Sequence, residues 1–147
     1  MPQGFVRSAG FGRGAGVAGR IENGLRQSLA LIGPDGVIFD STRKTLGAVL
    51  PDMTVRDPAQ TVIGRIEGGS VFLDDANRVI ARRLPDWRLV GPTELPLAII
   101  RAGAILSNDQ MPIALYSTTI NPVWVLAWFV YFSGLLDRSA EKDMTIR

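Results

Sequence analysis

Small residues recur every seventeen positions along this chain, each set beside large aliphatic side chains. These repeat-defining small residues are Ala30, Gly47, Gly64, Ala81 and Ala98. Nine positions before each of them stands a large apolar residue: Ile21, Ile38, Val55, Phe72 and Leu89. An Asn or an Asp follows the first four of these large residues at a distance of two positions: Asn23, Asp40, Asp57 and Asp74. A fixed period shared by three kinds of position indicates a repeat architecture.

Each unit is typical of two short strands joined by a tight turn. The strands, such as residues 37–40 and 46–49, are rich in Val, Ile, Leu and Phe and too short for helices. The turns that lead to the next unit contain Pro-Asp or Gly-Gly pairs, which suit tight turns. The pattern therefore predicts an all-β domain over residues 20–120, built from short 17-residue β-hairpin repeats whose first and last units are degenerate.

The small residues require a physical cause. Side chains no larger than a methyl group at equivalent places predict backbones that crowd one another, near a symmetry axis or a tight solenoid wall. Arg83 interrupts the aliphatic series Ile32, Val49, Ile66 and Ile100, which follows the small residues. We therefore expect Arg83 to be exposed or paired with an acidic side chain.

The segment Val55-Arg56-Asp57, with Val62-Ile63-Gly64-Arg65-Ile66 after it, resembles the repeat unit of the bacterial β-flower proteins. The resemblance implies β-hairpin petals arranged as a flower or ring around a pseudo-rotational axis, and it carries no activity with it. Five-fold members of that family end in a Trp- and Phe-rich segment that is similar to residues 124–132 here. The family's turn usually has Gly or Asn three residues after the Asp. Asn77 fits this pattern here, whereas Arg43 and Gln60 depart from it. A β-solenoid and an intertwined trimeric β-fibre remain the alternative architectures.

The most apolar part of the chain is the aromatic C-terminal segment, residues 121–136. It could plug the core of the repeat domain, pack against another subunit, or enter a bilayer. A spanning helix needs about 20 residues, whereas residues 123–136 supply fourteen after the break at Asn121-Pro122. Burial in protein is therefore favoured over membrane contact, and the predicted contact residues are Trp124, Leu126, Trp128, Phe129, Tyr131 and Phe132.

The two ends of the chain differ from the repeats in composition. Residues 1–19 are rich in Gly and Arg and are expected to form a flexible arm, because glycine loses much backbone entropy on folding. We expect the arm to dock on a neighbouring subunit through Phe5, Arg7, Phe11 and Arg13. Nucleic acid is not the expected partner, since so few arginines neutralise few phosphates. Residues 137–147 form a charged tail that is expected to fray.

The composition removes several kinds of chemistry. The chain of 147 residues has no Cys, no His and a net charge of +2, which excludes disulfides, thiolate zinc sites and triads that use His. Its acidic residues stand singly where turns begin, so we expect them to accept backbone hydrogen bonds there and not to bind calcium. The pair Asp74-Asp75 is predicted to point to opposite faces of a strand. No catalytic residue, metal, cofactor or small-molecule substrate is therefore expected.

These observations predict a non-enzymatic structural or interaction protein. It would assemble into a homo-oligomer or a larger particle, of the phage or cell-surface type, through the C-terminal segment and the arm. The alternative is a small membrane-associated accessory protein anchored by residues 113–136. Because the N-terminal Met-Pro-Gln-Gly starts no apolar signal core, the expected location is the cytoplasm or an assembled particle.

Overall fold

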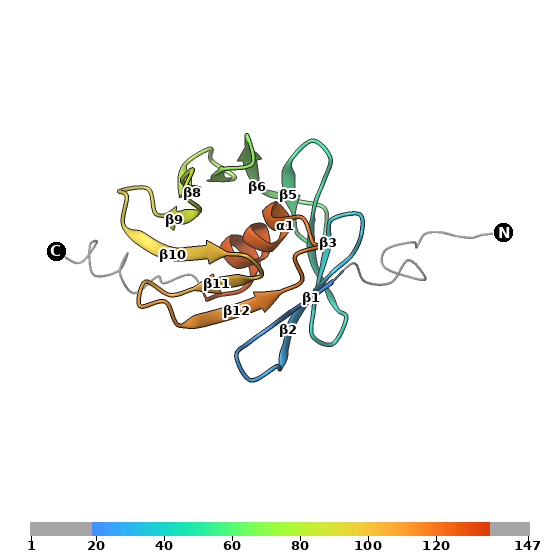
Figure 1. Ribbon diagram of the computed structural model, residues 1–147. Helices are drawn as coiled ribbons and strands as arrows, with labels where there is room; N and C mark the ends of the chain where they lie inside the picture. Colours follow the sequence, from blue (N-terminus) through green and yellow to red (C-terminus); the bar gives the residue numbers. More distant parts are fainter. Residues whose placement is uncertain (1–18, 136–147) are drawn as a thin grey trace.

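The computed structural model describes residues 19–135, in which twelve antiparallel strands form one closed barrel (Figure 1). Strands that are neighbours in the chain are neighbours in the barrel, and the first strand closes against the last. The strands are β1 (Gly19–Glu22), β2 (Ser28–Ile32), β3 (Val37–Asp40), β4 (Thr45–Val49), β5 (Thr54–Arg56), β6 (Val62–Glu67), β7 (Val71–Asp74), β8 (Val79–Arg83), β9 (Arg88–Val90), β10 (Pro96–Arg101), β11 (Ala104–Leu106) and β12 (Pro112–Tyr116). The all-β prediction is confirmed, and a single chain closes the barrel without the coiling of a solenoid or the strands of a second chain.

Two kinds of turn alternate around this barrel. Tip turns join the strands of one hairpin, such as β3 and β4, and link turns join one hairpin to the next, such as β2 and β3. Because the barrel is antiparallel throughout, the two kinds of turn lie at opposite ends of the strands.

The tip turns show why Asp stands where it does. Oδ1 of Asp40 accepts hydrogen bonds from the backbone N–H groups of Thr42, at 2.8 Å, and Lys44, at 2.9 Å. Asn23, Asp57 and Asp74 accept the same pair of bonds in their own turns. The third residue after the acid has a left-handed backbone, with φ of 72° at Arg43 and 70° at Gln60. The chain thus keeps the conformation that Gly or Asn favours while using other residues.

All six hairpins have a β-bulge. Beside it, a large residue on the first strand lies opposite a small residue on the second strand, and we call the residues of these pairs and others that face the core inner residues. Ile38 lies opposite Gly47 and Phe39 lies opposite Thr45, so that Leu46 is the extra residue. The equivalent pairs are Ile21 with Ala30, Val55 with Gly64, Phe72 with Ala81, Leu89 with Ala98, and Ile105 with Ala114. The bulge re-aims the extra aliphatic residue, which packs against the core beside its small neighbour.

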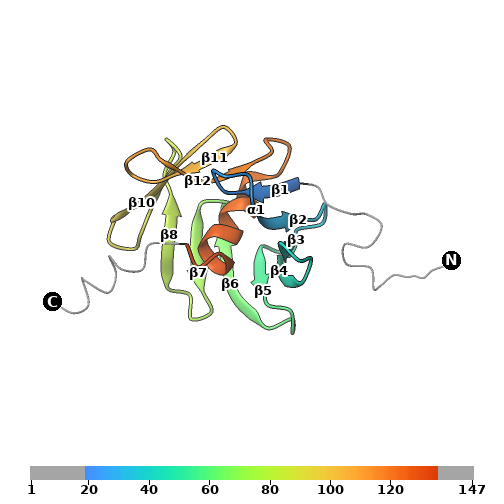
Figure 2. The ribbon, with the colours of Figure 1, turned by 90° about the horizontal axis from the view of Figure 1, so that it is seen from below.

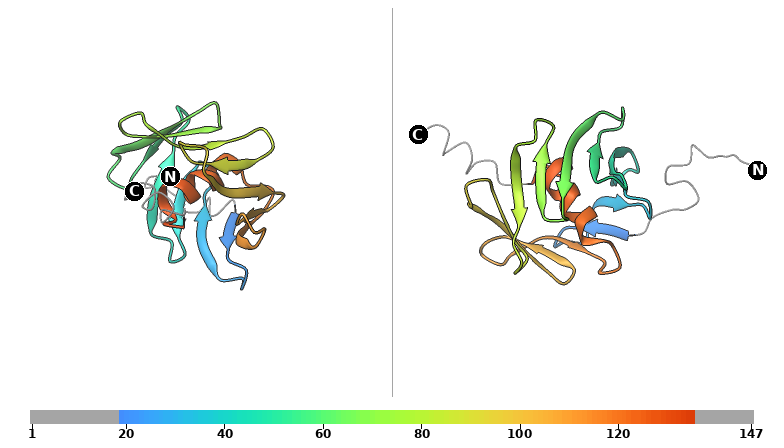
Figure 3. Two further views of the ribbon diagram at one scale, coloured as in Figure 1. Left: turned by 90° about the vertical axis from the view of Figure 1, so that its left-hand side faces the viewer. Right: turned by 90° about the horizontal axis from the view of Figure 1, so that it is seen from above.

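A helical segment occupies the middle of the barrel (Figures 2 and 3). It consists of α1 (Pro122–Ala127) and a π-helical continuation, η1 (Trp128–Phe132). Asn121 caps its start by accepting a 2.9 Å hydrogen bond from the backbone N–H of Val123, and Pro122 follows at a position that suits it. Residues 125–130 are all buried. The segment therefore supplies the centre of the core around which the strands pack.

The small residues of the strands make room for this segment. A Cβ atom built on Gly64 would lie 2.5 Å from Cε1 of Tyr131, and one on Gly47 would lie 2.5 Å from Cζ of Phe132. The predicted crowding between backbones is present, since carbonyl groups of adjacent strands are among the atoms nearest to these positions. The aromatic side chains of η1 add to it, in the place where an axis or a solenoid wall was expected.

Candidate functional site

The apolar C-terminal segment lies inside the barrel. Leu126, Trp128 and Phe129 are at most 2% exposed, and the partly buried Trp124, Tyr131 and Phe132 pack against the same core. The hydroxyl of Tyr131 donates a 2.6 Å hydrogen bond to the carbonyl oxygen of Leu73 in the barrel wall. Burial raises the pKa of this hydroxyl, which therefore stays protonated. The prediction of an outward contact surface at these residues is corrected: they form the core of their own chain.

The other predicted contact residues have different outcomes. Phe5, Arg7, Phe11 and Arg13 lie outside the described residues. Residues 113–116 of the expected membrane anchor belong to β12, and residues 122–132 form the central helical segment. Within residues 19–135, no helix is long and apolar enough to cross a membrane.

Two large apolar side chains are strongly exposed, each in a tip turn of one of two adjacent hairpins. Leu25, in the turn between β1 and β2, is 80% exposed, and Met111, in the turn before β12, is 63% exposed. The two turns are neighbours because β1 pairs with β12. We call Leu25 and Met111 the tip patch. Sequence reasoning missed this patch because it depends on closure of the barrel, which makes the first and last hairpins neighbours.

The acidic side chains have structural roles in turns. The hydroxyl and backbone amide of Thr42 and the amide of Lys44 hold the pKa of Asp40 below its ordinary value, since all three bond the charged form. Asp74 is bonded by backbone amides and forms an ion pair with Arg78 at 2.9 Å. No group of three or more acidic side chains that could hold a metal ion occurs within residues 19–135. The turn role predicted for these acids is therefore observed.

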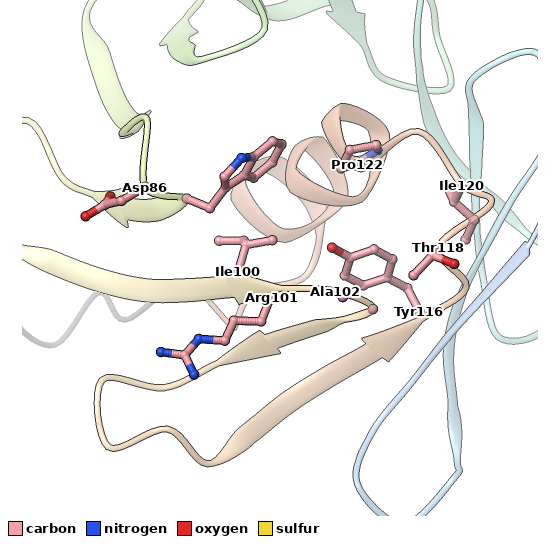
Figure 4. A pocket seen from close by; sticks show the side chains of 10 residues that line it. Asp86, Ile100, Arg101, Ala102, Tyr116, Thr118, Ile120 and Pro122 are labelled. Carbon is pink, nitrogen blue, oxygen red and sulfur yellow. The ribbon is translucent and has the colours of Figure 1, made fainter.

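A hollow of about 370 Å³ opens at the link-turn end of the barrel (Figure 4). Its lining comes from the link turn between β8 and β9, the end of β10, the link turn before β11, the end of β12, and the loop that leads to α1. Trp87, Ile100, Tyr116, Ile120 and Pro122 supply its apolar surface. The hollow thus brings together residues from the last two hairpins, the link turns before them and the start of the helical segment.

The interruption at Arg83 is directly connected to this hollow. The guanidinium carbon of Arg83 lies 4.1 Å from the ring centre of Trp87, one of the lining residues. The expectation that Arg83 is exposed or paired with an acid is wrong, because the side chain is half-buried, stacks on the indole and forms no ion pair within residues 19–135. In the sequence, the sign of this hollow was Arg83, which stands where four of the other units have an aliphatic residue.

Comparisons with protein-family models, with curated proteins and with solved structures find no match to this chain. Four features of the molecule therefore bear on its function. These are the closed wall, the filled interior, the exposed tip patch and the hollow beside Trp87.

Proposed function

We propose that this protein is a non-enzymatic structural or interaction component that assembles with copies of itself through the tip patch. The observation that carries the proposal is the strong exposure of Leu25 and Met111 on neighbouring hairpins. Burial of a side chain of this size is worth about 1.5–3 kcal/mol. Two such residues on each copy would form the apolar centre of a contact between copies.

The closed wall restricts how copies can meet. A closed barrel has no unpaired strand edge, so another chain cannot add a strand to it. The central helical segment already fills the interior. Contact must therefore use side chains on the outside of the barrel or the N-terminal arm.

The charges beside the tip patch favour a second copy as the partner. Arg26 is exposed in the same turn as Leu25, and Asp109 is exposed in the same turn as Met111. Neither forms an ion pair within residues 19–135. In a two-fold arrangement, each residue of one copy faces the complementary residue of the other. Arg26 of each copy would then lie close to Asp109 of its partner.

The proposal extends to the architecture and the wider assembly. Six hairpins around a central segment support a β-flower-like ring with six petals, in which the apolar C-terminal segment serves as the plug. The arm residues Phe5, Arg7, Phe11 and Arg13 would add contacts between copies, as in a particle of the phage or cell-surface type. Neither catalysis nor a nucleic-acid partner is part of this proposal.

The test is the solution mass of the full-length protein by light scattering in buffer without detergent. We expect a discrete oligomer, and we expect Leu25→Asp combined with Met111→Asp to give a monomer with an unchanged circular dichroism spectrum. Val62→Asp is the control, because Val62 is 39% exposed on a hairpin across the barrel. A wild-type monomer at high concentration, or an oligomer that the double variant leaves intact, would contradict the proposal. Protein that is uniform only in detergent would also contradict assembly through the tip patch. It would favour the membrane-associated alternative, for which residues 113–136 would have to leave the barrel.

A further inference from the structure

The hollow at the link-turn end exists because the inner residues change character there. In four hairpins the last inner residue of the second strand is aliphatic and buried: Ile32, Val49, Ile66 and Ile100. In the other two hairpins the equivalent residues are Arg83 and Tyr116. Trp124 and Val123 of α1 approach Gly36 and Gly69 at other link turns. At the link-turn end of the barrel, the circle of buried aliphatic residues is therefore interrupted at two hairpins. The large side chains at the start of α1 do not fill the space left there, and this space is the hollow.

Trp87 occupies an unusual backbone position in the wall of the hollow. Its φ is 66°, in the left-handed region that is costly for large side chains. Gly36, Gly69 and Gly103 hold left-handed positions in three other link turns, and Met53 does so in a fourth. The chain therefore places its largest side chain where glycine is usual. Arg83 holds the indole from one side, with its buried Nε lacking a hydrogen-bond partner among the described residues.

Tyr116 directs a polar atom into this apolar space. Figure 4 shows its hydroxyl pointing into the hollow, whereas the charged ends of Asp86 and Arg101 point away from it. The carboxylate of Asp86 is also held in an ion pair with Arg88 at 2.7 Å. A tyrosine hydroxyl is protonated near neutral pH and can donate a hydrogen bond, and burial raises the pKa of the Tyr116 hydroxyl further.

We propose that the hollow between Trp87 and Tyr116 binds a small, uncharged, planar aromatic molecule with a hydrogen-bond acceptor. The indole of Trp87 offers a stacking surface, Ile100 and Pro122 offer apolar contact, and the Tyr116 hydroxyl donates to the acceptor. Small ligand sites are usually of this kind, with mostly apolar walls and few polar groups, and the volume of about 370 Å³ falls in their normal range. The site is separate from the tip patch, which lies at the other end of the strands.

The experiment is a titration of the full-length, ¹⁵N-labelled protein with quinoline, followed by NMR. The chain has three Trp residues, so the indole N–H signal of Trp87 can be assigned with a Trp87→Gly variant. We expect saturable shifts of the Trp87 indole signal and the Gly103 amide, with a Kd of about 1 mM or tighter. Trp128, which is buried in the core, should show no shift.

Variants make the assignment specific. Trp87→Gly suits the left-handed backbone and removes the wall, so we expect at least a tenfold weaker Kd at the Gly103 signal. Tyr116→Phe removes only the hydroxyl and should weaken binding about fivefold, as expected for one hydrogen bond. Met53→Gly relieves the equivalent backbone position in another link turn and should leave the Kd unchanged.

Three results would overturn the proposal. The first is a shift that does not saturate up to the solubility of quinoline. The second is a Kd that Trp87→Gly leaves unchanged, or that Met53→Gly weakens as much as Trp87→Gly does. The third is a ligand-free Trp87 signal that moves with protein concentration, because the hollow would then accept an aromatic side chain from a second copy.

Discussion

Replacement of Gly64 by Ala tests whether the central helical segment sets the size of the inner residues. Gly64 lies opposite Val55 in its hairpin and faces Tyr131 of η1. The added methyl carbon would lie 2.5 Å from the carbonyl oxygen of Leu73 and 2.5 Å from Cε1 of Tyr131. A carbonyl group within a strand ladder cannot move away freely, so the ring of Tyr131 and the local backbone must both shift.

The expected magnitude follows from these contacts. Overpacking of a tight core costs about 1–3 kcal/mol. A shift of Tyr131 also weakens its 2.6 Å hydrogen bond to Leu73, worth about 1 kcal/mol. We therefore expect Gly64→Ala to lower the free energy of unfolding by about 2–4 kcal/mol, a large part of the roughly 5–15 kcal/mol of a typical domain. Gly64→Val adds two more methyl groups and should prevent folding.

The assay is urea denaturation followed by tryptophan fluorescence, because the buried Trp128 reports on the core. Gly24→Ala is the control, since a Cβ atom at this exposed tip turn would meet no other atom within 4 Å. Its unfolding free energy should stay within about 0.5 kcal/mol of the wild type. Equal urea midpoints for Gly64→Ala and Gly24→Ala would refute the reasoning.

Two further predictions concern pH. Burial raises the pKa of Tyr131 in the folded state, so its contribution to stability is fully present below the unfolded pKa of about 10 and falls above it, by up to about 1.4 kcal/mol per pH unit. Urea melts of Tyr131→Phe should show a smaller alkaline slope, with Tyr116 supplying the remainder, and an unchanged slope would contradict the assignment. Hydrogen bonds from the Thr42 hydroxyl and nearby amides lower the pKa of Asp40 in the folded state. Its contribution to folding stability is therefore present above the unfolded pKa of about 3.9 and is lost as the pH falls through the folded pKa. Asp40→Asn keeps the acceptor oxygen without titrating, and acid unfolding curves should therefore depend less on pH; curves identical to the wild type would show that this turn does not contribute.

The local features of the fold could be predicted from the sequence. Short stretches rich in Val, Ile, Leu and Phe, Pro-Asp or Gly-Gly turns and single Asp residues predicted short hairpins with acids that bond turn amides, and the structure contains them. Asn121-Pro122 was predicted to interrupt any helix, and the helical segment begins at Pro122. These features depend on residues within a few positions of one another, so their chemistry can be read directly along the chain.

The candidate sites could not be predicted in the same way. The apolar segment had three physically reasonable places to be buried, and its pattern does not distinguish the inside of its own barrel from another protein. Leu25 and Met111 lie on adjacent hairpins only because β1 closes against β12. Arg83 was noticed as an interruption, but its stacking on Trp87 depends on the path of the link turn.

The sequence by itself determined the repeat period, the strands and the turn chemistry, because these follow from local backbone preferences and the alternation of side chains. The tertiary structure decided the closure of twelve strands, the position of residues 122–132 inside them and the identity of the surfaces left outside. Closure depends on contacts between distant residues and on whether the enclosed volume can be filled. Here the small inner residues leave that volume open, and the aromatic segment is large enough to fill it.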